Sequence, residues 1–171
     1  MKLYGTKIPI IAREIVRHLT ANGNIEVNNY DEAELDIQAV LREYLRVERD
    51  ITNSTKDLME NRKLAHDQFG KTKRAMAEQK GFPLAEEGIL FMCNQILETF
   101  MQSQFVEEIY ASDADMRKNM KEILRRHMLV DEELDVEVRQ RIKNLTEGSS
   151  QWDVEYGKVM EQLRHTRDLK D

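Results

Sequence analysis

A stretch of twelve residues occurs twice in this chain. Residues 40–51 and residues 123–134 align without a gap, 83 positions apart. Five of the aligned pairs conserve size and polarity, and three are identical: Leu41/Leu124, Arg42/Arg125 and Val47/Val130. In a protein with an internal repeat, each copy can cover the apolar face of the other. We therefore predict a duplicated helical unit with pseudo-twofold symmetry, made of residues 1–82 and 83–171 packed together as one structural unit.

The repeat extends in both directions with small changes of spacing. Downstream, residues 69–71 (Phe-Gly-Lys) align with residues 156–158 (Tyr-Gly-Lys), 87 positions apart. Upstream, residues 15–16 align with residues 96–97, 81 positions apart. The four-residue difference between the offsets 83 and 87 is about one turn of α-helix, so side chains beyond the insertion return to nearly the same face. This spacing indicates helical structure on both sides of the insertion.

The composition favours helices throughout. The chain contains two prolines and seven glycines among 171 residues. The segments between them are rich in Leu, Glu, Lys, Arg, Met and Gln, which have high helix propensity. Charged residues make up 34% of the chain, above the usual share of about 25%, so we expect much of each helix to face solvent. The predicted fold class is all-α.

In the first half, a helix is expected to begin near Pro9, with an apolar stripe over residues 8–19. Residues 25–27 alternate in a way typical of extended backbone, and Asn29 or Asp31 can cap a second helix. That helix is expected to bury Ile37, Val40, Leu41, Tyr44 and Val47. We predict a break near residues 50–54, since Ser54-x-x-Asp57 resembles a capping box. A long helix would then run to about Lys80. Its apolar seam is sparse, which indicates a projecting arm that shares a thin stripe with one neighbour.

The second half is expected to repeat this plan. Pro83 stands at a helix start, and residues 84–106 are apolar on more than one face, which is typical of a central helix. Ser112 can cap the next helix, whose stripe would contain Met116, Met120, Ile123 and Leu124. His127 occupies the position of Tyr44 in the first half, where we expect a half-buried side chain. After an acidic turn near residues 130–137, a helix would continue to Gly148, and a last helix would follow it.

Cys93 is the single cysteine. It lies in the apolar run at residues 89–93, where a buried, inert thiol is the expected state. The N-terminus lacks the apolar stretch of a signal peptide, and no window approaches the 18 or so apolar residues of a membrane span. We therefore expect a cytoplasmic protein without a membrane partner.

Three segments carry a resemblance to a known family: residues 1–5 (Met-Lys-Leu-Tyr-Gly), the stripe at residues 8–19 and the block at residues 40–51. They resemble an uncharacterised bacterial family, the domain of unknown function 507, and the resemblance spans the whole chain. It implies an all-helical fold with two related halves, in which a helical-bundle base bears two projecting helical arms. It implies no activity and no functional residue.

The sequence offers little chemistry. It contains no glycine loop for phosphates, no Gly-x-Ser-x-Gly elbow and no Cys-x-x-Cys pair. Glu14/His18 and Glu161/His165 are four residues apart, a spacing more typical of a surface ion pair than of the Glu-x-x-His pairs of di-iron bundles. We predict no catalytic residue, no metal and no cofactor. An enzyme whose site is assembled from scattered residues is an alternative.

The favoured hypothesis is a non-enzymatic protein-interaction or scaffold module. The last helix of each half would offer a contact surface, anchored by Phe69 and Met76 in the first half and by Trp152 and Tyr156 in the second. The sequence does not decide whether a second copy of the chain completes these seams.

The second alternative is weak, nonspecific nucleic-acid binding through basic arm tips. The candidate phosphate contacts are Lys71, Lys73, Arg74 and Lys80. The sequence pI of about 5.4 and an aromatic share of 6% argue against this alternative, because nucleic-acid modules are commonly basic and stack bases on aromatic rings.

Overall fold

The computed structural model describes residues 2–146 and 149–168, with the backbone but not the side chains at 130, 131 and 168. The predicted helix end at Gly148 lies outside these residues. Packing divides the chain into two compact units. The larger unit is Leu3–His127, and the smaller unit combines Met1–Lys2 with Met128–Asp171. This division by packing differs from the halves 1–82 and 83–171, which stay a prediction about kinship between two sequence segments.

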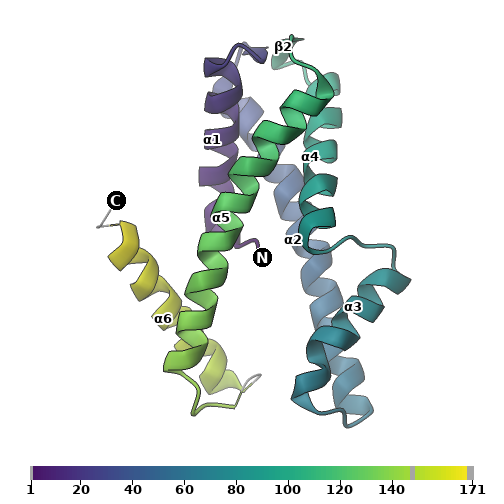
Figure 1. The fold of residues 1–171 in the computed structure, drawn as a ribbon, viewed down its shortest axis with the longest axis vertical. Helices are drawn as coiled ribbons and strands as arrows, with labels where there is room; N and C mark the ends of the chain where they lie inside the picture. The colour runs from purple at the N-terminus through teal and green to yellow at the C-terminus, as the bar shows by residue number, and fades with distance from the viewer. Residues whose placement is uncertain (1, 147–148, 169–171) are drawn as a thin grey trace. The chain divides into compact units, whose positions relative to one another are not determined.

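The described residues form mostly α-helices (Figure 1), so the all-α prediction is confirmed. The larger unit contains, in chain order, α1 (Ile8–Ala21), β1 (Ile25–Val27), α2 (Tyr30–Asn61), α3 (Phe69–Gln79), α4 (Ala85–Gln102), β2 (Val106–Ile109) and the first part of α5 (Asp113–Arg141). The smaller unit contains the rest of α5 together with α6 (Ser150–Asp168). The order helix, strand, long helix, shorter helix thus occurs twice along the chain.

Helix α1 shows how the sequence builds the core of the larger unit. Its apolar residues recur every three or four positions and are all buried: Ile8, Ile11, Ala12, Ile15, Val16 and Leu19. Pro9 stands in the first turn, as predicted, where its missing N–H leaves no hydrogen bond unmade. The Asn29 side chain accepts a hydrogen bond from the Glu32 amide at 3.2 Å and thereby caps α2. Ser112 caps α5 in the same way through the Asp115 amide.

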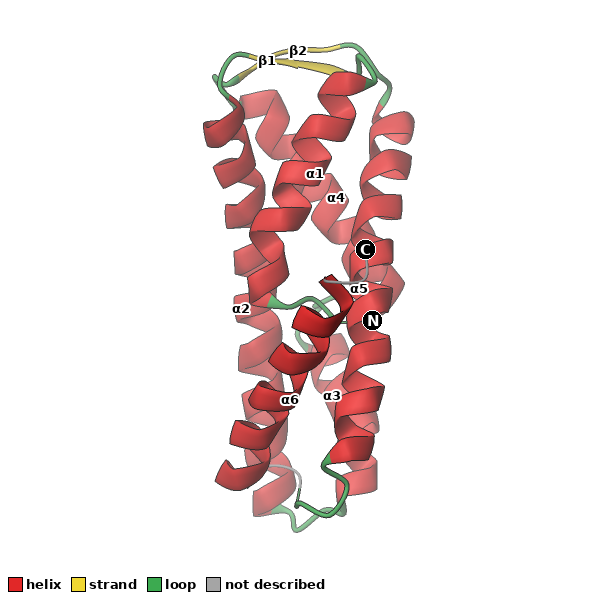
Figure 2. Cartoon of the chain, turned by 90° about the vertical axis from the view of Figure 1, so that its left-hand side faces the viewer, coloured by secondary structure: helices red, strands yellow, loops and turns green. Residues whose placement is uncertain are grey.

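The extended stretch predicted at Ile25–Val27 is confirmed as β1, and it pairs antiparallel with β2. Figure 2 shows this pair at one end of the helices of the larger unit. Ile25 is paired with Ile109, and Ile25 and Val106 are buried. The second strand was not predicted, because the apolar segment 84–106 was interpreted as helix throughout and Val106, its last residue, begins the strand. Helix α4 instead ends at Gln102.

The predicted break at residues 50–54 is wrong. Helix α2 continues through this segment to Asn61, because Ile51, Thr55 and Met59 are buried at helical spacing. The Thr55 hydroxyl donates to the Ile51 carbonyl at 2.7 Å inside the helix, and Ser54 therefore caps nothing. The chain turns later, at Lys63, whose φ of 52° lies in the left-handed region.

The long helix predicted up to Lys80 is consequently wrong as well. The short helix η2 (His66–Gln68) follows the turn, and α3 then packs back against α2 as a hairpin. The acidic turn predicted near residues 130–137 is also wrong, because α5 runs continuously to Arg141. Ion pairs one helical turn apart offset the repulsion within this acidic run: Arg139 with Asp135 and Arg141 with Glu137.

Within the residues that the structure describes, no helix is both long enough and apolar enough to cross a membrane.

Candidate functional site

The four predicted protein contacts lie in two separate hairpins. In the α2–α3 hairpin, Phe69 and Met76 are half-buried, and the Thr55 hydroxyl donates to the Met76 sulfur at 3.4 Å. In the α5–α6 hairpin, the rings of Trp152 and Tyr156 stack with their centroids 5.0 Å apart. All four side chains therefore contribute to packing within their own hairpins, and whether they also contact a partner remains a prediction.

Two further contacts hold the α6 aromatic pair in place. The Arg139 guanidinium lies 5.3 Å from the centre of the Trp152 ring, a distance suited to a cation–π interaction. The Tyr156 hydroxyl donates a hydrogen bond to the Asp135 carboxylate. These contacts fix both rings against α5, so their apolar surface is partly used within the hairpin.

The predicted phosphate contacts differ in accessibility. The Lys73 ammonium forms an ion pair with Glu48 at 3.0 Å, and the two side chains are 20% and 14% exposed. Lys73 is thus committed to the packing of α3 against α2. Lys71, Arg74 and Lys80 are exposed.

An apolar concave surface lies between α2 and α4, which are neighbours in the larger unit (Figure 1). We call it the α2/α4 groove. Its volume is about 450 Å³. The lining residues are Asp36, Ala39, Val40, Glu43, Tyr44 and Val47 from α2, Phe91, Gln95 and Thr99 from α4, and Phe82 from the segment before α4.

Tyr44 forms the floor of this groove. Its ring centre lies 4.8 Å from that of Phe82 and 6.3 Å from that of Phe91. Its hydroxyl donates to the Pro83 carbonyl at 2.9 Å. Burial of this hydroxyl raises the pKa of Tyr44 above its usual range, and the nearby Glu48 carboxylate adds to the effect. Tyr44 therefore stays neutral and ties the connection between α3 and α4 to α2.

Gly88 permits the close approach of α4 to Tyr44. A Cβ atom at this position would lie 2.2 Å from the Tyr44 hydroxyl oxygen and 3.0 Å from the Pro83 carbonyl oxygen. Neither oxygen can move without breaking the hydrogen bond between them. The absence of a side chain at Gly88 is thus a condition for the groove.

The charge of the groove is acidic. Among the described residues that line it, Asp36 and Glu43 are carboxylates, and none is Lys or Arg. Asp36 accepts a hydrogen bond from the Ser103 hydroxyl at 3.1 Å. Glu43 pairs with Arg46 on the neighbouring solvent-facing surface of α2.

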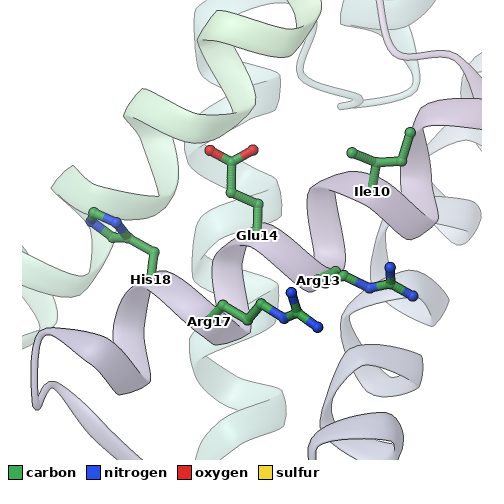
Figure 3. Close-up of a pocket in the computed structure, with 5 residues that line it drawn as sticks. All are labelled: Ile10, Arg13, Glu14, Arg17 and His18. Carbon is green, nitrogen blue, oxygen red and sulfur yellow. The ribbon is translucent and has the colours of Figure 1, made fainter. Parts of the chain in front are cut away.

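A second concave surface lies on α1 and is shown in Figure 3. We call it the α1 hollow. It is lined by Ile10, Arg13, Glu14, Arg17 and His18, with a volume of about 470 Å³. The offset of 81 residues found in the sequence places Ile10, Glu14 and His18 at the positions of Phe91, Gln95 and Thr99. The two concave surfaces therefore use corresponding faces of α1 and α4.

The α1 hollow is polar where the α2/α4 groove is apolar. Glu14 forms ion pairs with Arg126 and with His127, whose Nε2 atom lies 2.6 Å from the carboxylate. At the offset of 83 residues, Arg126 and His127 correspond to Glu43 and Tyr44. The sequence predicted a pair of Glu14 with His18, but the Glu14 carboxylate contacts Arg126 and His127 instead. The Nε2 atom of His18 lies 3.1 Å from the side-chain amide nitrogen of Asn22.

The α2/α4 groove was missed in the sequence because Val40 and Val47 were assigned to the core. Both are half-buried and line the groove. Residues 36, 40, 43 and 47 form a second stripe on α2, beside the core stripe that contains Ile37, Leu41 and Tyr44. A stripe beside the core stripe in which valines alternate with carboxylates, here Val40 and Val47 with Asp36 and Glu43, is the signal that points to a groove as well as a core.

No group of three or more His, Cys, Asp or Glu side chains placed to hold a metal ion is found in the described part of the chain.

Comparison with protein families gives a match over nearly the whole chain. Residues 1–169 match the family described as Protein of unknown function (DUF507). The chain belongs to this family. The resemblance noted in the opening segments is thereby confirmed over nearly the whole chain. No match is found among curated proteins.

Proposed function

We propose that this DUF507 protein is a non-enzymatic, cytoplasmic interaction module that binds a helix of a partner protein in the α2/α4 groove. The contrast between two corresponding surfaces carries the proposal. Phe91 is 38% exposed beside Val40 and Val47, whereas ion pairs of Glu14 line the corresponding surface on α1. Exposed apolar surface in a groove commonly marks an interaction site, and an amphipathic helix is a frequent occupant of a groove between helices.

The chemistry of the groove defines its partner. An apolar floor favours Leu, Ile, Met or aromatic anchors that recur at helical spacing. Asp36 and Glu43, with no cation among the described lining residues, favour Lys or Arg beside those anchors. The partner is therefore a helix that is apolar on one face and basic along its edge.

A capture experiment with two matched variants tests this proposal. Phe91→Glu places a charge in the groove, and Ile10→Glu places the same charge at the corresponding position of α1, where the side chain is 51% exposed. Both variants and the wild type are immobilised and exposed to a lysate of the source organism, and each captured protein is then purified and titrated. We expect a partner whose affinity falls at least about tenfold in Phe91→Glu, or about 1.4 kcal/mol, and is unchanged in Ile10→Glu. Equal affinity for all three chains would contradict the proposal.

Nucleic-acid binding is a second candidate, supported by one observation. Among the described residues, Lys71, Arg74 and Lys80 have no ion-pair partner and are exposed. Phosphate contacts by such side chains weaken steeply with salt. If the protein binds nucleic acid, its affinity for a labelled DNA or RNA duplex should fall at least tenfold between about 50 and 200 mM salt. The affinity should also fall in the double variant Lys71→Ala with Arg74→Ala. Binding that is absent or insensitive to salt rejects it.

A further inference from the structure

We propose that the α1 surface of a second copy of this chain occupies the α2/α4 groove, so that the protein associates with itself head to tail. This inference rests on the proposed function and names a partner for it. The required partner presents an apolar anchor beside basic residues on one helix. Helix α1 presents Ile10 beside Arg13 and Arg17.

The α1 surface is accessible and its cations are available. Ile10 is 51% exposed. Arg13 pairs with Glu34 at 3.8 Å, and the Arg13 side chain is 62% exposed. Arg17 is exposed and has no ion-pair partner among the described residues. Figure 3 shows the guanidinium groups of Arg13 and Arg17 extending in a similar direction from α1, away from the direction of the Glu14 carboxylate.

The spacing of the charges fits the groove. Arg13 and Arg17 are four residues apart, which is about 6 Å along a helix, and Asp36 and Glu43 are seven residues apart, which is about 10 Å. Arginine side chains are long enough to span this difference. Glu43 already pairs with Arg46, but a carboxylate has acceptor sites for a second guanidinium. Ile10 would then lie over the apolar part of the groove, against Phe91.

Charge also decides between the ways in which two copies can meet. A symmetric contact of groove with groove brings Asp36 and Glu43 of one copy against the same carboxylates of the other. A symmetric contact of α1 with α1 brings Arg17 towards Arg17. Like charges at an interface are costly, whereas α1 against the groove joins opposite charges. Contact between unlike surfaces is therefore favoured, and in the proposed head-to-tail arrangement each added copy leaves one free α1 surface and one free groove.

The experiment measures the weight-average mass of the full chain by sedimentation equilibrium, from about 10 µM to about 1 mM protein. For the wild type we expect a mass that rises with concentration beyond twice the monomer mass of 20.2 kDa. Because the contact is electrostatic in part, we expect it to weaken at high salt. Ile10→Glu and Phe91→Glu should each stay monomeric, and Leu35→Glu, an equally exposed apolar position at 52% outside the groove, should behave as the wild type.

A mixture of the two monomeric variants gives the deciding result. Ile10→Glu retains a working groove and Phe91→Glu retains a working α1 surface, so an equimolar mixture should form a one-to-one dimer and grow no further. A wild type that stays monomeric, a mixture that stays monomeric, or a loss of association in Leu35→Glu would each overturn the inference. Circular dichroism confirms that every variant is folded. If self-association fails while Phe91→Glu still loses a captured partner, the proposed function stands without this inference.

Discussion

Cys93 lies in the core of the larger unit, and its burial changes the pH at which the thiol loses its proton. Desolvation raises the pKa of Cys93 to about 12 from an ordinary value of 9.0, although Lys121 and Arg117 oppose the shift. The sequence predicted this burial, and the structure confirms it. Cys93 lies in an apolar run on a helix that is apolar on more than one face, and a cysteine in such surroundings is usually buried.

The raised pKa makes stability depend on alkaline pH. The folded state keeps the Cys93 proton up to about pH 12, whereas the unfolded state releases it near pH 9. Stability from this group is therefore complete below pH 9 and is lost as the pH rises toward 12. We expect the free energy of unfolding to fall by about 1 kcal/mol more between pH 8 and pH 10 in the wild type than in Cys93→Ala, measured by urea denaturation. Equal losses in both chains would refute this role of Cys93.

Gly88 gives a second prediction at the scale of a residue. Gly88→Ala places a methyl group against the Tyr44 hydroxyl and the Pro83 carbonyl, and we expect it to destabilise the fold by about 1–3 kcal/mol. Gly157→Ala is the matched control, because it lies within α6 and its Cβ would meet no atom within 4 Å. That change should stabilise by about 0.5–1 kcal/mol, since alanine favours helix. Urea titration of both variants measures the two effects, and a Gly88→Ala protein as stable as the wild type contradicts the close approach.

The elements themselves were predictable where one strong stripe or one cap defined them. The first stripe of α1, the cap at Asn29 and the extended residues of β1 were correctly assigned. The boundary between α2 and α3 was not correctly predicted. Ser54-x-x-Asp57 resembles a capping box, but it lies within α2, which continues because Ile51, Thr55 and Met59 are buried. A local cap signal loses to tertiary packing when one face of the segment is buried at helical spacing.

The α2–α3 hairpin supplies a prediction at the scale of the element. The Lys73–Glu48 pair is largely shielded from water, whereas the Arg46–Glu43 pair on α2 is about 60% exposed on both sides. Ion pairs shielded from solvent couple more strongly than exposed ones. A double-mutant cycle of Lys73→Met with Glu48→Gln should give a coupling free energy of about 1–2 kcal/mol. The same cycle on Arg46 and Glu43 should give at most about 0.5 kcal/mol.

Equal coupling free energies in the two cycles would contradict the role of Lys73 in fixing α3 on α2. They would also return Lys73 to the group of residues available for phosphate, together with Lys71, Arg74 and Lys80.

At the scale of the whole molecule, the sequence repeat predicted two halves of similar plan, but it predicted neither the second strand nor the relative lengths of the helices. The same succession of helix, strand, long helix and shorter helix occurs twice, and two concave surfaces use corresponding residues of α1 and α4. Duplication followed by divergence is our interpretation of this correspondence. The chemical difference between the two surfaces was hidden in the sequence. It depends on Glu14 reaching Arg126 and His127, more than 110 positions away, and no local pattern records such a contact.

The most direct test of the account is the affinity of one purified partner for four versions of the chain: wild type, Phe91→Glu, Phe69→Glu and Trp152→Glu. The α2/α4 groove as the docking site predicts that Phe91→Glu weakens binding at least about tenfold, while both hairpin variants bind within about twofold of the wild type. Full affinity of Phe91→Glu, combined with loss of binding in Phe69→Glu or Trp152→Glu, would contradict the groove and place the contact on the hairpins.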